Sequence, residues 1–360
     1  MKSVSDNTVL QKNKQRIAYI DLLKLIAVFI VITLHNGTWH TDFISSGNFA
    51  NVFQYGIRLV SEGVPLFLLV NGFLLLPRKF QLKKHLIRTL NIFIIIIIWS
   101  VIFDLFFSVL EGSTITFNSV LDTVLNTQIG DPRTGVLWFL QSLFVIYLFF
   151  PIVKYIYDTN FNLFKYLLLI LLISRYTVSL FSIVSGATSN PIFDSLFFVV
   201  QQYSLNIGNS IYLIYFMVGG YLFKQKDNLK YAYVLIAAIC SFAVSLGVGI
   251  FLSNKNGATY TPNYLYSQIT LLVILVALFL TCSKIPLKNN TINKILAIFG
   301  DNTMGIYLLH RIIIVLLNEY VPVSGGLVVR LFMSVVTLII SCMITLIIRK
   351  IPKINYIIKL

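Results

Sequence analysis

The residues that could do chemistry in this 360-residue chain are the few ionisable side chains within its long apolar runs. Lys24 and His35 both fall in the first run, residues 17–35, and are 11 residues apart. On a helix, 11 steps of 100° leave a residual of about 20°, so the two side chains share one face about 16 Å apart. An extended anionic molecule could therefore contact a cation and an imidazole on the same face. The alternative is that Lys24 snorkels towards the membrane surface and His35 caps the helix at the interface.

Further ionisable groups fall at one depth of the membrane, in the outer parts of five expected helices. Such groups are costly in a bilayer unless they are paired or hydrated, so a common depth indicates a polar chamber that opens outward. Snorkelling of the arginines to the outer headgroups is the competing interpretation. The set consists of His35, Arg58, Glu62, Asp104, Arg175, His310 and Arg311.

His35 is the candidate catalytic base of this chamber, because an imidazole titrates near neutral pH and can remove the proton of an attacking hydroxyl. It would need a carboxylate to orient it, and Glu62 and Asp104 are the candidates by depth. His310 could be an oxyanion donor or a second base. We expect the substrate chamber to be lined by Arg58, Asn71, Tyr307 and Arg311.

A dense basic stretch lies between residues 78 and 88. Guanidinium and ammonium groups suit the phosphates of a nucleotide-bearing donor, but such a stretch can also serve topology and anionic lipid headgroups. Motifs for nucleotide hydrolysis, dinucleotide redox chemistry and zinc are missing from the sequence, so no metal is expected. The candidate donor-binding residues are Lys24, Arg78, Lys79, Lys83, Lys84 and Arg88.

Composition indicates the elements that must position these residues. Hydrophobic residues make up 57% of the chain and charged residues 11%, whereas a soluble domain has about 25% charged residues. Because only helices and closed barrels satisfy the backbone in lipid, we predict an all-α polytopic membrane protein of about ten transmembrane helices. The predicted spans are 17–35, 54–76, 88–109, 136–157, 164–183, 195–222, 232–252, 264–282, 295–317 and 327–348.

Lysine and arginine gather in both terminal segments and in alternate loops, whereas the remaining loops hold only Arg133 and Lys255. The positive-inside rule then places both termini in the cytoplasm. The net charge of +15 is therefore a topology signal, and no nucleic-acid partner is expected. We predict a cytoplasmic tail over 1–16, a membrane domain over 17–348 and a second cytoplasmic tail over 349–360, in a multi-pass protein of the cell membrane.

Several segments together resemble the membrane-bound acyltransferase-3 family. The first helix reads Asp21-Leu22-Leu23-Lys24, ten residues, then His35, with Lys24 where the family typically has arginine. The second reads Val64-Pro65-Leu66-Phe67-Leu68-Leu69-Val70-Asn71-Gly72, with Asn71 in place of serine. Similar segments are Leu137-Trp138-Phe139-Leu140, Tyr215-Phe216-Met217-Val218-Gly219-Gly220 and Gly305-Ile306-Tyr307-Leu308-Leu309-His310.

The resemblance implies transfer of an acyl group, usually acetyl from cytoplasmic acetyl-CoA, to an extracytoplasmic glycan or glycolipid, with His35 as the base. Membrane lipids and polysaccharide-export proteins are the other expected partners. Two alternatives remain. One is a transporter or flippase for a polysaccharide precursor, which would use the same chamber without covalent chemistry and is typically built from repeats or broken helices. The other is an inactive relative that serves as an assembly partner.

Overall fold

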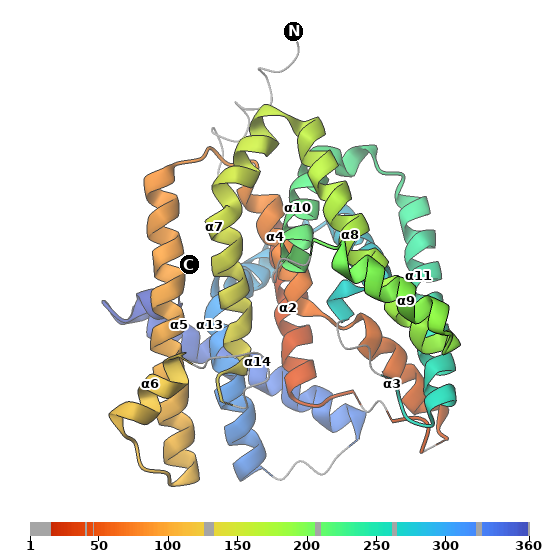
Figure 1. Cartoon of the computed structure of the whole chain (residues 1–360). Helices are drawn as coiled ribbons and strands as arrows, with labels where there is room; N and C mark the ends of the chain where they lie inside the picture. Colours follow the sequence, from red (N-terminus) through yellow and green to blue (C-terminus); the bar gives the residue numbers. More distant parts are fainter. Residues whose placement is uncertain are drawn as a thin grey trace.

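The computed structural model describes residues 16–39, 42–45, 47–125, 133–205, 210–260, 265–321 and 326–358 (Figure 1). Helices account for nearly all of these residues, and the described part of the chain contains no strand. This confirms the all-α class. The helices are α2 (Ala18–His35), α3 (Phe49–Val60), α4 (Gly63–Leu75), α5 (Leu82–Glu111), α6 (Phe117–Leu125), α7 (Trp138–Thr159), α8 (Phe161–Thr188), α9 (Pro191–Gln202), α10 (Ser210–Gln225), α11 (Tyr231–Asn256), α12 (Ile269–Lys284), α13 (Asn290–Tyr320) and α14 (Leu327–Lys350).

Eight helical segments of the described chain are long and apolar enough to cross a membrane, which confirms a polytopic membrane protein. They correspond to the predicted spans one to five, seven, nine and ten. The predicted eighth span is the shorter apolar helix α12, which has 16 residues. Apolar runs bounded by charge thus located the elements well, because in lipid the length of a helix follows the length of its apolar run.

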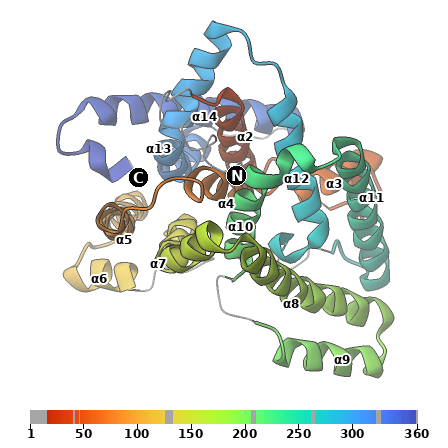
Figure 2. The ribbon, with the colours of Figure 1, turned by 90° about the horizontal axis from the view of Figure 1, so that it is seen from above.

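The predicted sixth span, 195–222, is wrong as a single helix. The chain forms α9 up to Gln202 and starts α10 at Ser210, and residues 206–209 lie outside the described residues. The polar residues Gln201 and Gln202 close the first helix. α9 packs beside α8 on the outside of the bundle, whereas α10 is largely buried (Figure 2).

The second span is broken where the sequence predicted one continuous helix over 54–76. Ser61 and Glu62 leave the helical conformation between α3 and α4. Pro65 explains the break, because in a continuous helix its ring would clash with the carbonyl of Ser61 and its nitrogen could not donate to it. Within the first turn of α4 a missing N–H costs nothing, since those N–H groups have no partner inside the helix.

α4 occupies the middle of the bundle, with α2, α10 and α13 around it (Figure 2). Its contact with α10 depends on glycine. A Cβ atom at Gly72 would lie 1.7 Å from the carbonyl oxygen of Phe216, and one at Gly219 would lie 2.0 Å from the carbonyl oxygen of Leu69. The two backbones therefore touch directly, which is typical of small residues at helix contacts in membranes. This contact fixes α4 and the side chains that it contributes to the site.

The basic loops lie on one side of the molecule. In Figure 1 the α4–α5, α7–α8 and α10–α11 connections are all at the top. The tail predicted over 349–360 is not free of the bundle over its described part. α14 continues to Lys350, and a short turn at Asn355–Ile358 follows. There the indole of Trp99 donates to the carbonyl of Ile357 at 2.9 Å, and Ile358 is buried. Most of the predicted tail over 1–16 lies outside the described residues.

Candidate active site

Two histidines from helices that are distant in sequence meet at one point. His35 is the last residue of α2, and His310 lies in the middle of α13. The Nε2 atom of His310 is 3.3 Å from Nδ1 of His35, and the ring centroids are 4.9 Å apart. His310 is fully buried, whereas His35 is exposed. The structure thus brings together the two predicted catalytic imidazoles, with one of them accessible from outside the protein.

Tyr307 supports this pair from one turn earlier on α13. Its backbone carbonyl contacts Nδ1 of His310, and its hydroxyl donates to the carbonyl of Val136 at 2.6 Å. Its ring packs against His310 on one side and against Phe67 and Phe139 on others. Tyr307 therefore links the histidine pair to α4 and α7.

Tyr307 also lines a cavity of about 390 Å³, whose lining residues include neither His35 nor His310. Two further predicted residues, Lys24 and Asn71, line the same cavity. The rest of its wall is mostly apolar and comes from α4, α7, α13 and the C-terminal turn: Phe67, Val70, Phe139, Leu143, Met304 and Ile358. A volume of this size, lined by both apolar and polar side chains, is typical of small-molecule sites.

The mouth of this cavity carries opposite charges. Asp301 and Arg349 line it, and Lys24 donates to the carbonyl of Gly300 at 3.5 Å. Arg16 bridges Asp21 at 2.5 Å and Asp301 at 2.8 Å, and hydrogen bonds to these two carboxylates raise the pKa of Arg16 above its ordinary value. The N-terminal end of α2 is thereby tied to α13 beside the opening.

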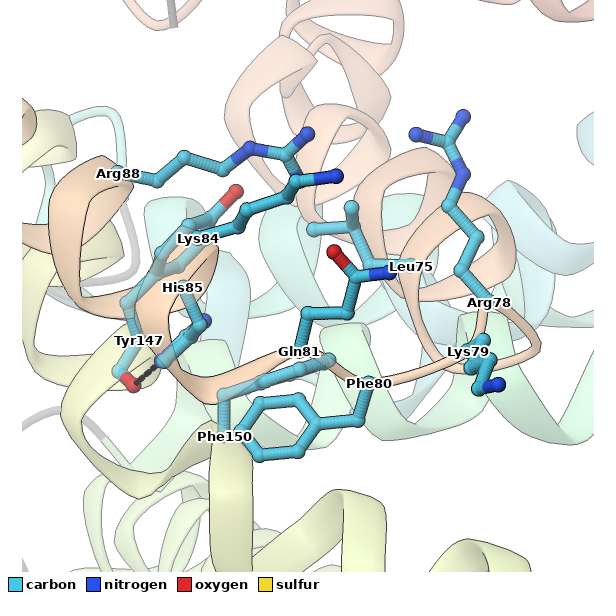
Figure 3. Close-up of a pocket in the computed structure, with 10 residues that line it drawn as sticks. All are labelled: Leu75, Arg78, Lys79, Phe80, Gln81, Lys84, His85, Arg88, Tyr147 and Phe150. Carbon is cyan, nitrogen blue, oxygen red and sulfur yellow. Dashed lines mark hydrogen bonds between the residues drawn. The ribbon is translucent and has the colours of Figure 1, made fainter.

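The predicted basic stretch forms a second pocket of about 200 Å³ (Figure 3). Four of the six predicted donor-binding residues line it: Arg78, Lys79, Lys84 and Arg88. Lys83 is exposed and lines neither of the two cavities, and Lys24 belongs to the larger one. The charge of Arg78 in the basic pocket acts on Lys24 in the wall of the larger cavity, so these two cations lie near each other.

One side of the basic pocket is aromatic. Figure 3 shows the charged ends of Arg78, Lys84 and Arg88 above, with the rings of Phe80 and Phe150 below. His85 is buried at the same side: its Nε2 donates to the carbonyl of Tyr147 at 2.8 Å, and its ring stacks on Phe150 at 5.0 Å. Cations on one side and flat rings on the other suit a ligand with both phosphates and an aromatic ring.

Glu62 and Arg58 pair with each other at 2.9 Å. Glu62 is buried, and the hydroxyl of Tyr266 interacts with the same carboxylate. The charges of Arg58 and Arg311 act on His35. Two of the predicted chamber residues therefore lie near His35, but Glu62 does not hydrogen bond to it.

Asp104 pairs with residues other than the two histidines. It is completely buried and accepts from Arg133 at 3.1 Å and from Thr123 at 2.8 Å. These partners connect α5 to α6 and to the segment before α7. Depth in the membrane suggested Asp104 as the partner of His35, but depth does not fix the position of a residue around the bundle.

The residues predicted from the sequence do not include His85, Tyr147 and Phe150, which line the basic pocket, or Asp301, which lines the larger cavity. The available signal for His85 was the spacing of His85, Arg88 and Thr89, which places them on one face of a helix. No comparable signal exists for Tyr147 and Phe150, because aromatic residues within a transmembrane run usually serve packing.

The fold and the site define a polytopic membrane protein in which a cavity with apolar and charged lining residues is linked through Tyr307 to a histidine pair. Residues 17–346 match the sequence model of a family described as an acyltransferase domain. The chain therefore belongs to the acyltransferase-3 family, and it is a membrane acyltransferase by class. Comparisons with curated proteins and with solved structures gave no match.

Proposed function

We propose that the protein is an O-acyltransferase of the cell membrane. It transfers an acyl group, in the first instance acetyl, from cytoplasmic acyl-CoA to a hydroxyl of an extracytoplasmic glycan or glycolipid. The observation that carries this proposal is the contact between the cavity and the histidine pair through Tyr307. Neither histidine lines the cavity itself, so the reacting end of a donor in the cavity would have to pass Tyr307 to reach the base.

The donor would lie along this space. Its phosphates fit the cations of the basic pocket and Lys24, which carry charge-assisted hydrogen-bond donors. The flexible arm fits the apolar wall made by Phe67, Phe139 and Leu143. Lys24 and His35 lie 11 residues apart on α2, or about 16 Å at 1.5 Å per residue. An extended molecule held at Lys24 can therefore reach the region of the imidazoles.

In the chemical step the Nε2 atom of His35 accepts the proton of the acceptor hydroxyl. The oxygen attacks the thioester carbonyl, an O–C bond forms, the C–S bond breaks, and the thiolate receives the proton from the imidazolium. The acceptor is expected to approach from the exposed side of His35, where Arg58 and Arg311 are near. Polysaccharide-export proteins are candidates for delivering such an acceptor.

The test uses the full-length protein in liposomes with radiolabelled acetyl-CoA and the envelope glycans of cells that lack the gene. Label should pass to the glycan, and His35→Ala should lower kcat by about 10²- to 10⁴-fold, the usual contribution of a general base. Correct folding of the variant is checked by size-exclusion chromatography of the detergent-solubilised protein. Unchanged transfer by His35→Ala would remove the assigned base. A complete lack of transfer by the natural sequence, together with movement of glycan across the bilayer, would favour transport.

A further inference from the structure

We propose that His310 is the positioning residue for His35 and occupies the place that a carboxylate holds in many base-assisted transfers. This inference rests on the proposed function and assigns one residue of that mechanism. It differs from both roles expected from the sequence, oxyanion donor and second base.

The protonation of His310 follows from its partners. Its Nδ1 atom contacts the backbone carbonyl of Tyr307, and a carbonyl oxygen can only accept. Nδ1 therefore carries a hydrogen, which is not available to an oxyanion. The ring is completely buried, and an isolated charge is costly to bury, so we take the ring as neutral. A neutral imidazole with hydrogen on Nδ1 has a lone pair on Nε2.

The same reasoning applies to His35. Its Nδ1 atom is 2.9 Å from the carbonyl of Val31, which again requires a hydrogen on Nδ1. That hydrogen is shared with the lone pair of His310 at 3.3 Å. Val31 thus selects the tautomer, and His310 holds the Nδ1 edge of the ring towards the protein interior. Nε2 of His35 is left without a hydrogen and can act as the base.

No carboxylate performs this task in the described part of the chain. Glu62 pairs with Arg58, and Asp104 pairs with Arg133 and Thr123. The charged groups that act on His35 are Arg58 from α3 and Arg311 from α13, and both are cations. When His35 takes the acceptor's proton, the acceptors for its Nδ1 hydrogen are therefore the carbonyl of Val31 and the lone pair of His310. Loss of His310 removes one of these two acceptors at the moment when the ring becomes positive.

A matched pair of substitutions tests this role. In His310→Gln the side-chain amide can reach the position of the imidazole Nε2 and accept from His35. In His310→Asn the amide ends near the position of Nδ1, where it can satisfy the carbonyl of Tyr307 but cannot reach His35. Both variants keep a polar group in the buried site, so their effects on folding should be similar.

The measurement is steady-state transfer from radiolabelled acetyl-CoA to envelope glycans by the liposome-embedded protein. We expect His310→Asn to lower kcat by about 10- to 100-fold, as loss of an orienting partner typically does, with an unchanged KM for acetyl-CoA. His310→Gln should recover most of that loss. Equal kcat for the two variants, full activity of His310→Asn, or an effect on KM alone would overturn the proposal. If in the same assays the natural protein transfers label and His35→Ala does not, the proposed function still stands even when the role of His310 is overturned.

Discussion

Replacing Lys24 with alanine should weaken donor binding without slowing the chemical step. The Lys24 ammonium lies on the wall of the larger cavity, and its hydrogen bond within the described part of the chain is a long contact of 3.5 Å to the carbonyl of Gly300. An ammonium has three donors, so most of its hydrogen-bonding capacity is available to a ligand. A hydrogen bond to a charged group contributes about 1.5–3 kcal/mol, which corresponds to a KM higher by about 10- to 150-fold.

The assay is transfer at a series of acetyl-CoA concentrations with saturating acceptor. Lys83→Ala is the matched control, because Lys83 belongs to the same basic set but is exposed and lines neither cavity. Lys24→Arg keeps the charge and should stay close to the natural KM. If Lys24→Ala and Lys83→Ala give the same KM, or if Lys24→Ala changes only kcat, the assignment of Lys24 to the donor is refuted.

Three other measurements test the framework of the site. Tyr307→Phe removes a hydroxyl that donates to a buried carbonyl at 2.6 Å, so unfolding in detergent should require about 1–3 kcal/mol less free energy, and an unchanged melting temperature would contradict this. Gly72→Val places atoms against a backbone oxygen of α10 and should sharply reduce the yield of folded protein, whereas Gly186→Val, at a glycine with open space around it, should not; equal yields would mean that the glycine contact is dispensable. In a cysteine-free background, a membrane-impermeant thiol reagent added to intact cells should label Ser113→Cys and not Asn228→Cys, and the reverse pattern would invert the predicted orientation.

Helices could be predicted from the sequence because lipid imposes a simple rule: each span needs an uninterrupted apolar run. The first predicted span, 17–35, differs from α2 by one residue, and the tenth, 327–348, ends two residues before α14 does. The rule failed where the run was apolar but the backbone could not continue. The break near Pro65 could have been predicted from the sequence, because a proline ring clashes with the carbonyl four residues earlier and its nitrogen cannot donate a hydrogen bond.

The site was predictable only within single helices. Lys24 and His35 could be placed on one face because 11 residues bring a helix nearly back into phase. The contact between His35 and His310 spans 275 positions, and no periodicity links residues on different helices. Depth narrows the candidates to one layer of the membrane, but several helices cross that layer. For this reason the same argument that selected His310, which contacts His35, also selected Asp104, which is paired with Arg133 instead.

The register of α2 against α13 explains how the two ends of the proposed donor path are fixed together. Lys24 contacts Gly300 at one end and His35 contacts His310 at the other, so the helices run parallel. The intervals are 11 and 10 residues, or about 16 and 15 Å at 1.5 Å per residue, and both contacts can form at once. Glycine permits this closeness, because a Cβ atom at Gly300 would lie 2.1 Å from a carboxylate oxygen of Asp21. A slide of one helix along the other by a single turn would move both contacts out of reach, so the two contacts together fix the register of α2 against α13.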